Sequence, residues 1–385
     1  MRNILFLHAG AELYGSDIVL YNILKGLDKN LFTPYVILPN DGPLVDKIRD
    51  LGIFCEVIDY PILRRKYFTP IGILKYIINY KFMCSRIEKK IDNIDIDIIH
   101  NNTGAVLEGI YLKKKLNARL IFHIHEMIEN PKFLRVILSK LFARYGNTTI
   151  CVSRAVHDYL IQDAKYEDIR VIHNGIDNKI FHPNYDSNIL LLAKNQLCIP
   201  SNSLVVGMIG RVNAIKGQDD FIKAITPVLK KHTNVYAIMV GGVFTGQEWR
   251  LEKLKDEISN LDDDVRNRVK LIEFREDNYI IHNLIDIYIF PSIGYDSFPT
   301  VILEAMASAT PVIGYEKGGI SEMIDDGING YLVKVGDVEE LSQKIEYLIN
   351  NQSIREKFSQ KALLKQKKFF TILSQAKNFE KLYNE

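Results

Sequence analysis

The sequence predicts an α/β protein with two doubly wound domains that face a cleft. Short runs of β-branched and aliphatic residues alternate with longer segments of helical period, a pattern typical of parallel sheets covered by helices. At 385 residues the chain is too long for one ordinary core, because a domain holds about 150 residues. Periodicity is lost at residues 174–203, where Asn, Pro, Asp and Ser cluster as in a linker.

The first domain is expected over residues 1–180. Its strands are predicted in the runs NILFL, YVILP, IDIIH, RLIFHI, TTICV and IRVIHN, with helices over 17–27, 44–51 and 105–116. The amino-terminal apolar run is short and no cleavage-site pattern follows it. We therefore interpret it as a buried strand and not as a signal peptide.

The second domain is expected over residues 200–364. Its strands are predicted in LVVGMIG, YAIMVGG, VKLIEF, IYIFPS, PVIGY and GYLVK, with helical patterns such as 219–229 and 320–324. A terminal helix at about 365–385 is expected to pack back on the first domain. Ligands of open α/β sheets bind outside the carboxyl ends of the strands, so the expected site is the cleft between the domains.

Composition and motifs argue against several classes of protein. The net charge of +2 provides no field for nucleic acid, and the four scattered cysteines suggest neither a disulfide framework nor a zinc site but a reducing, cytoplasmic compartment. The G-x-G-x-x-G fingerprint of a nicotinamide dehydrogenase is missing after the first strand. An exported clamshell binding protein would need a signal peptide.

Candidate functional residues follow two strands of the second domain. Arg211 and Lys216 follow VVGMIG, while Asp296 and Glu304 follow IYIFPS. Two cations and two carboxylates suit a ligand with an anionic centre and hydroxyl-rich ends. On a helical projection Glu304 falls among small residues, away from the apolar side that includes Ala309, so it could accept hydrogen bonds from a vicinal diol. A Glu favoured by the helix dipole is the alternative interpretation.

These segments carry a family resemblance. The stretch GYDSFPTVILEAMASATPVIGYEKGGISEMIDDGINGYLVKVGD resembles the signature of glycosyltransferase family 4, the retaining nucleotide-sugar glycosyltransferases of the GT-B fold, with two Rossmann-like domains. GRVNAIKGQDDFI and VIHNGID resemble two further motifs of that family, in the same order. The family has a first Glu where this chain has Asp296, and a Gly where it has Ala309.

The resemblance implies roles for residues of the second domain. Glu304 would bind the donor ribose, and Arg211 and Lys216 would bind its diphosphate. Asp296 would face the transferred sugar, and backbone amides near Phe298 and Thr300 would hold sugar and phosphate. Cations suited to phosphate stand where another enzyme would use a metal, so neither a metal nor a cofactor is expected.

The resemblance extends to two positions of the first domain. Gly15 corresponds to the family's glycine-rich first loop, whose neighbouring positions here are Tyr14 and Asp17. His125 corresponds to the family's cleft histidine, with His123 as a nearby competitor or a purely structural histidine as the alternative. A plain βα turn is the alternative interpretation for Gly15.

The expected function is therefore sugar transfer from a nucleoside-diphosphate sugar, with retention, to a glycan or lipid-linked acceptor in surface polysaccharide biosynthesis. An inactive nucleotide-binding protein of the same fold, and an enzyme with a soluble acceptor, remain alternatives. Residues 61–90 carry eight Lys and Arg against one acid, interleaved with apolar residues. This pattern is typical of a surface that binds anionic lipid, and Arg64, Arg65 and Lys66 are its first cations; a solvated helix face is the alternative.

Overall fold

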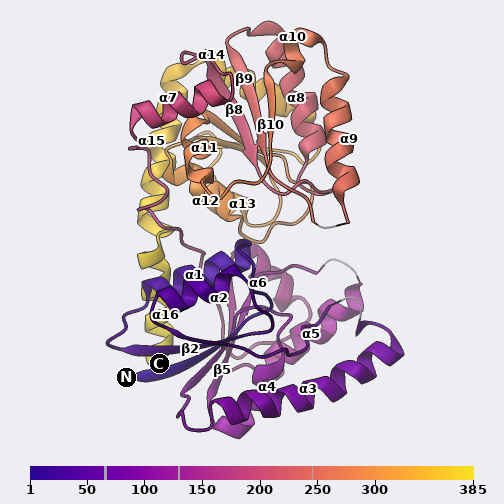
Figure 1. The fold of residues 1–385 in the computed structure, drawn as a ribbon, viewed down its shortest axis with the longest axis vertical. Helices are drawn as coiled ribbons and strands as arrows, with labels where there is room; N and C mark the ends of the chain where they lie inside the picture. The colour runs from indigo at the N-terminus through magenta and orange to yellow at the C-terminus, as the bar shows by residue number, and fades with distance from the viewer. Residues whose placement is uncertain (65–66, 129–130, 245) are drawn as a thin grey trace. The chain divides into compact units, whose positions relative to one another are not determined.

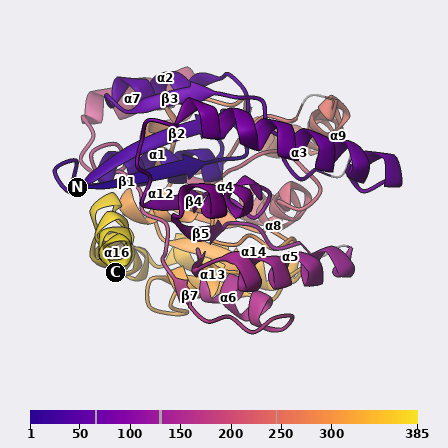
Figure 2. The ribbon, with the colours of Figure 1, turned by 90° about the horizontal axis from the view of Figure 1, so that it is seen from below.

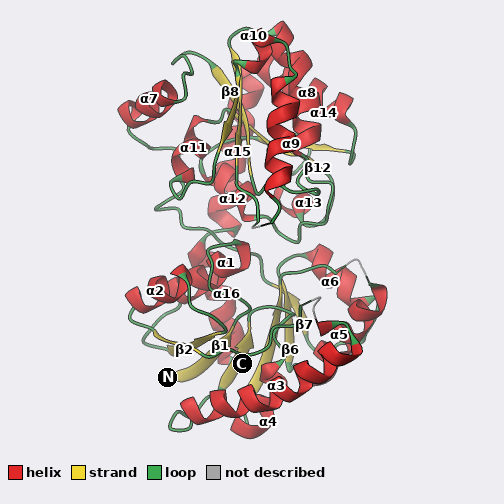
Figure 3. Cartoon of the chain, turned by 45° about the vertical axis from the view of Figure 1, so that its right-hand side comes forward, coloured by secondary structure: helices red, strands yellow, loops and turns green. Residues whose placement is uncertain are grey.

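The computed structural model describes residues 1–64, 67–128, 131–244 and 246–385. The chain forms two compact units, unit 1 of Met1–Gly175 with Ile372–Glu385 and unit 2 of Ile176–Thr371 (Figure 1). Each unit has one fully parallel sheet flanked by helices, as Figure 3 shows. The predicted class, two doubly wound Rossmann-like domains, is confirmed.

Unit 1 contains a seven-stranded sheet in the order β3-β2-β1-β4-β5-β6-β7. Its strands are β1 (Arg2–Leu7), β2 (Phe32–Leu38), β3 (Phe54–Val57), β4 (Ile98–Asn101), β5 (Arg119–Ile124), β6 (Thr148–Cys151) and β7 (Ile169–Val171). Its helices are α1 (Gly15–Gly26), α2 (Pro43–Asp50), α3 (Pro70–Lys90), α4 (Glu108–Leu116), α5 (Lys132–Tyr145), α6 (Arg154–Ile161) and α16 (Ile372–Asn384). β1 lies between β2 and β4, where the direction of winding reverses.

The last helix of the chain belongs to unit 1. α16 packs on α1 so closely that a Cβ on Gly26 would lie 2.7 Å from Cγ2 of Ile372. Phe379 and Tyr383 of α16 are buried with the side chains of the sheet, and the Arg2 guanidinium donates to the Tyr383 carbonyl. The terminal helix therefore completes the apolar core of unit 1.

Unit 2 contains a six-stranded sheet in the order β10-β9-β8-β11-β12-β13. Its strands are β8 (Leu204–Ile209), β9 (Val235–Val240), β10 (Val269–Ile272), β11 (Ile287–Phe290), β12 (Val312–Tyr315) and β13 (Gly330–Val333). Its helices are α7 (Ser187–Gln196), α8 (Gln218–Lys231), α9 (Glu248–Ser259), α10 (Asp263–Arg266), α11 (Asn278–Leu284), α12 (Thr300–Ala307), α13 (Ile320–Met323), α14 (Val338–Asn350) and α15 (Gln352–Phe369). The reversal of winding lies between β8 and β11.

The sequence prediction lacked several elements, among them β3 and α7. The chain forms β3, which has no counterpart among the predicted strands, because this edge strand has only four residues and is largely exposed or half-buried. α7 lies inside the segment expected to be a linker. Asp186 caps it by accepting from the Asn188 N–H at 2.8 Å, but Leu191 and Leu192 face outward, so no apolar stripe of helical period marks this helix.

Candidate functional site

The predicted residues of unit 2 lie at the reversal point of its sheet. Arg211 and Lys216 follow β8, and Asp296 follows β11, the strand beside it. Where the strand order reverses, the connections that leave two neighbouring strands run in opposite directions. This leaves room for a ligand outside the carboxyl ends of the strands. Strand order therefore places residues that are about 80 positions apart at one edge.

Lys216 and Asp296 form an ion pair. Lys216 Nζ lies 2.7 Å from Asp296 Oδ1, and the Ser292 hydroxyl donates to Asp296 Oδ2 at 2.7 Å. Both charged side chains retain about a fifth of their exposure, so the pair reaches solvent. Neither the ion pair nor the contribution of Ser292 was predicted. Both Asp296 oxygens are engaged, which holds the carboxylate at a defined position beside the cation.

Glycines bring the backbone of this site close together. Gly217 has φ +77°, and a Cβ there would lie 1.8 Å from the Pro291 carbonyl oxygen. Gly318 has φ +73°, and a Cβ there would lie 2.2 Å from the Asp296 carbonyl oxygen, which also accepts from the Gly319 N–H at 3.1 Å. Only glycine combines positive φ with so close an approach. These contacts fix the loops that carry Lys216 and Asp296.

Arg211 is placed by an aromatic ring. Its guanidinium carbon lies 3.5 Å from the centroid of Phe244, a cation–π contact, and its carbonyl accepts from Gln218 Nε2 at 3.0 Å. Arg211 is half-buried. The structure thus presents a second cation after β8, as predicted.

Glu304 is more enclosed than the helical projection suggested. It is 7% exposed, and every residue of α12 from Ile302 to Ala307 is buried. Its Oε2 accepts from His282 Nε2 at 3.1 Å and lies 3.4 Å from Asn278 Nδ2. The predicted small neighbours are present, but Ala309, assigned to the apolar side, is half-buried beyond the end of the helix with φ +58°.

Phe298 and Thr300 lie at the amino end of α12. Thr300 is the first helical residue, and the N-cap Pro299 contributes no side-chain hydrogen bond. Unsatisfied N–H groups at such an end favour an anion. The Phe298 side chain is buried edge-to-face against Phe370 at 5.5 Å, so it is the backbone at this position that remains the candidate.

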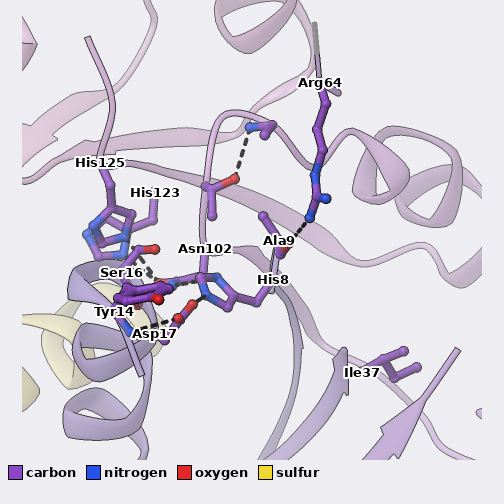
Figure 4. A network of polar contacts seen from close by, with 12 residues as sticks. His8, Ala9, Tyr14, Ser16, Asp17, Ile37, Arg64, Asn102, His123 and His125 are labelled. Atoms are coloured by element: carbon purple, nitrogen blue, oxygen red, sulfur yellow. Dashed lines mark hydrogen bonds and ion pairs between the residues drawn. The ribbon is translucent and has the colours of Figure 1, made fainter. Parts of the chain in front are cut away.

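Unit 1 has a polar network at its own reversal point, between β1 and β4 (Figure 4). His8 follows β1 and is fully buried, with Nε2 2.6 Å from Asp17 Oδ1 and Nδ1 3.1 Å from Asn102 Nδ2. Since a carboxylate only accepts and the amide nitrogen only donates, His8 carries its hydrogen on Nε2. Asp17 Oδ2 also accepts from the Tyr14 N–H at 3.0 Å. The sequence indicated Asp17 only as the acid of the first loop. In the structure its carboxylate connects α1 to His8 at the end of β1.

His123 and His125 both approach the side-chain amide of Asn102. Asn102 Oδ1 lies 3.1 Å from His123 Nδ1 and 3.4 Å from His125 Nε2. His123 is fully buried, and its pKa is held well below the usual range by burial and by the neighbouring His125, His100 and His8. His125 is half-buried, and burial with His8 and His100 likewise lowers its pKa. His123 is therefore a core residue, and His125 is the histidine nearer the surface.

Gly15 is the first residue of α1. A Cβ on Gly15 would meet no atom within 4 Å, so the packing of this unit does not require glycine there. Open space beside the first turn of a helix is compatible with a ligand near the backbone. The role implied for Gly15 remains a prediction.

Comparisons with known proteins identify the family of the chain. The family model described as Glycosyltransferase Family 4 matches residues 14–179, and that described as Glycosyl transferases group 1 matches residues 192–365. The chain is 26% identical over 234 residues to the capsular polysaccharide biosynthesis glycosyltransferase CapM of Staphylococcus aureus, covering 60% of each protein. The match thus spans less than two thirds of CapM.

A second relative is matched over most of its length. The N,N'-diacetylbacillosaminyl-diphospho-undecaprenol alpha-1,3-N-acetylgalactosaminyltransferase of Campylobacter jejuni is 26% identical over 366 residues, which is 90% of this chain and 89% of that protein. The crystal structure of Anabaena HepE in complex with UDP and glucose superimposes with a TM-score of 0.85, at 24% identity and with all of both chains covered. That likeness shows the fold. With two family models matched in order along nearly the whole chain, the protein belongs to the family 4-like glycosyltransferases of the GT-B fold.

Proposed function

We propose that the protein transfers a sugar from a nucleoside-diphosphate sugar, with retention of anomeric configuration, to a glycan or lipid-linked acceptor. The observation that carries the proposal is the Lys216–Asp296 pair at the reversal point of unit 2, whose side chains are each about one-fifth exposed. One group is a cation suited to a departing diphosphate, and the other is a carboxylate suited to sugar hydroxyls. HepE, of the same fold, binds UDP and glucose, which supports a donor of this class.

The chemistry requires charge stabilisation at the leaving group. As the bond between the anomeric carbon and the phosphate oxygen breaks, negative charge grows on the diphosphate, and Lys216 and Arg211 would stabilise it electrostatically. Lys216 Nζ has three hydrogens, so it can keep its 2.7 Å contact with Asp296 while it binds a phosphate oxygen. Two cations can replace the divalent metal that other glycosyl transfers use, and so we propose that no metal is required.

The relatives support a place in surface polysaccharide synthesis. CapM is named for capsular polysaccharide biosynthesis, and the Campylobacter enzyme is named for an undecaprenol-linked acceptor. Another relative, the lipopolysaccharide core biosynthesis mannosyltransferase LpcC of Rhizobium leguminosarum, is 29% identical over 216 residues, which is 56% of this chain and 59% of that protein. We propose capsule, O-antigen or exopolysaccharide assembly as the setting of this chain.

A panel of nucleotide sugars tests the reaction. We expect turnover of at least one donor, with transfer or slow hydrolysis, and we expect the rate to persist in excess EDTA. Lys216→Met should lower that rate about a hundredfold, since charge-assisted contacts contribute about 1.5–3 kcal/mol each. Lys223→Met, on the exposed side of α8, is the matched control.

Two results would overturn the proposal. Binding of a nucleoside diphosphate without turnover of any donor would favour the inactive nucleotide-binding alternative. Activity that disappears in EDTA and returns with magnesium or manganese would contradict the metal-free mechanism. Analysis of the product anomer by NMR decides between retention and inversion.

The membrane proposal concerns the outer side of α3. The described part of the chain has no helix long and apolar enough to cross a bilayer. The buried side of α3 includes Cys84 and Ile87. Four large apolar side chains face outward, namely Ile71, Leu74, Ile78 and Phe82. Their spacing of three or four residues places them on one face of the helix. Figure 2 shows α3 along the outside of unit 1.

Cations surround this apolar face. Lys75, Lys81 and Arg86 of α3 are exposed, and the only acid of residues 61–90 is Glu88, which accepts from the Tyr111 hydroxyl at 3.2 Å. Aliphatic side chains with flanking cations match an anionic lipid surface. Arg64 is exposed and donates to the Ala9 carbonyl at 3.4 Å; Arg65 and Lys66 lie outside the described residues.

We expect wild-type protein to bind anionic vesicles at low salt and to be released by high salt. Reversal of Arg64, Arg65 and Lys66 to Glu, or of Lys75 and Lys81 to Glu, should abolish binding, since each cation is worth about 1 kcal/mol near such a surface. Lys357→Glu with Lys367→Glu on α15 of unit 2 changes the net charge by the same amount as reversal of Lys75 and Lys81, and this variant should bind normally. Wild-type protein that ignores anionic vesicles at low salt would favour a solvated face and a soluble acceptor.

A further inference from the structure

Glu304 is held by α11. His282 Nε2 lies 3.1 Å and Asn278 Nδ2 3.4 Å from the same carboxylate oxygen, Oε2. These two residues are four positions apart, so they share one face of the helix. The other oxygen, Oε1, accepts no hydrogen bond from the described residues. One half of the carboxylate is therefore anchored and the other half is available.

The imidazole of His282 is immobilised. It has no exposed surface, it stacks on Tyr288 at 5.5 Å with an interplanar angle of 20°, and Phe181 contacts it nearly edge-on at 5.7 Å. Rotation of the ring about its Cβ–Cγ bond would require these neighbours to move. The Nε2–H donor is consequently fixed in direction as well as in distance.

A purely structural role does not account for a histidine at this position. Because Glu304 Oε2 only accepts, the hydrogen in this contact belongs to His282 Nε2. Nδ1 is buried and has no hydrogen-bond partner in the part of the chain that the structure describes, which is unfavourable for a polar atom. A phenyl ring would fill the same space between Tyr288 and Phe181 without an unsatisfied atom. The contribution of His282 is thus its hydrogen bond to Glu304.

We propose that His282 is a positioning residue for donor recognition, whose Nε2–H anchors Glu304 Oε2 and leaves Oε1 directed to the ribose diol. This inference rests on the proposed function, in which Glu304 binds the ribose. A free glutamate samples many rotamers and loses that freedom when it binds a ligand. Anchoring one oxygen beforehand removes part of this loss, which is preorganisation of a binding group.

The test compares two ligands that differ only at the ribose. Calorimetry measures the affinities of UDP and 2′,3′-dideoxy-UDP, or the same pair for whichever base the donor panel selects. We expect wild-type protein to prefer the ribonucleotide, and His282→Phe to reduce that preference about tenfold. His282→Gln should restore it, because the Gln amide nitrogen can occupy the position of Nε2. Tyr279→Phe, on the same helix but stacked on Tyr185, should keep the wild-type preference.

The outcomes separate this inference from the proposed function. If Glu304→Gln leaves the preference intact, the ribose role of Glu304 is wrong and His282 has nothing to position. If Glu304→Gln abolishes the preference while folded His282→Phe retains it, the inference about His282 alone is wrong. Thermal unfolding is measured for each variant. If His282→Phe does not fold, His282→Asn replaces it and is compared with His282→Gln. The shorter Asn amide cannot reach Glu304, whereas the Gln amide can.

Discussion

Asp296→Asn should lower turnover at least tenfold, about 1.4 kcal/mol, while the affinity for nucleoside diphosphate barely changes. The Asp296 carboxylate receives hydrogen bonds from Lys216 and Ser292, each at 2.7 Å. The Asn amide has one accepting oxygen instead of two, and it lacks the negative charge that pairs with Lys216. Because the proposed contact is with the transferred sugar, the substitution should lower kcat. Rates with saturating donor, together with calorimetry of the diphosphate, measure the two quantities.

Asp296→Glu should not restore activity. One more methylene displaces the carboxylate by about 1.5 Å, whereas Ser292 and the Gly318 contact hold the loop in place, and catalytic contacts do not tolerate such a displacement. Asp325→Asn is the matched control, because Asp325 forms an ion pair with Lys365 at 2.9 Å elsewhere on unit 2. Near-normal turnover in Asp296→Asn would show that this acid is a loop residue without a role in transfer.

Wild-type protein should become less stable as the pH rises, and Glu108→Gln should reduce this dependence of stability on pH. Glu108 is fully buried at the start of α4; Oε2 accepts from the Leu107 N–H at 3.0 Å, and Oε1 has no partner among the described residues. Burial raises the pKa of Glu108 from 4.5 to about 8, although hydrogen bonds from its own and the Leu107 backbone N–H oppose the shift.

The sign follows from proton binding. Between pH 4.5 and 8 the unfolded chain has lost this proton and the folded chain retains it, so stability falls with rising pH. The loss begins near the unfolded pKa and is complete above the folded one. Since each pKa unit corresponds to about 1.4 kcal/mol, wild-type unit 1 should lose several kcal/mol across this window.

Chemical denaturation of full-length protein at pH 5 and pH 9 measures the effect. The free energy of unfolding should depend less on pH in Glu108→Gln than in wild type, and hydrogen exchange should locate the change in α3 and α4, which pack together. Glu339→Gln, at an exposed position of α14, is the control. Equal pH dependence in wild type and Glu108→Gln would contradict a protonated Glu108.

Much of the architecture could be predicted from local pattern. Buried strands of parallel sheets are continuous apolar runs, and the helices between them have a 3.6-residue period, so most elements of both sheets were visible in the sequence. Edge strand β3 and helix α7 were missed, since neither buries enough side chains to produce a pattern. Arg211, Lys216, Asp296 and Glu304 were identifiable because each follows a buried strand.

The partners of those residues were decided by the tertiary structure alone. Spacing along the chain indicates which strand end carries a side chain, but the order of strands in the sheet determines which ends are neighbours. β11 lies beside β8, and for that reason Asp296 meets Lys216. In the same way α11 packs on α12, which brings buried His282 to Glu304, and β4 beside β1 brings Asn102 to His8. The sequence by itself determined the fold class and the strand ends that bear charged groups, because both depend on local periodicity. The side chains that orient these groups lie on segments distant in sequence, and only the packing of those segments determines which of them come into contact.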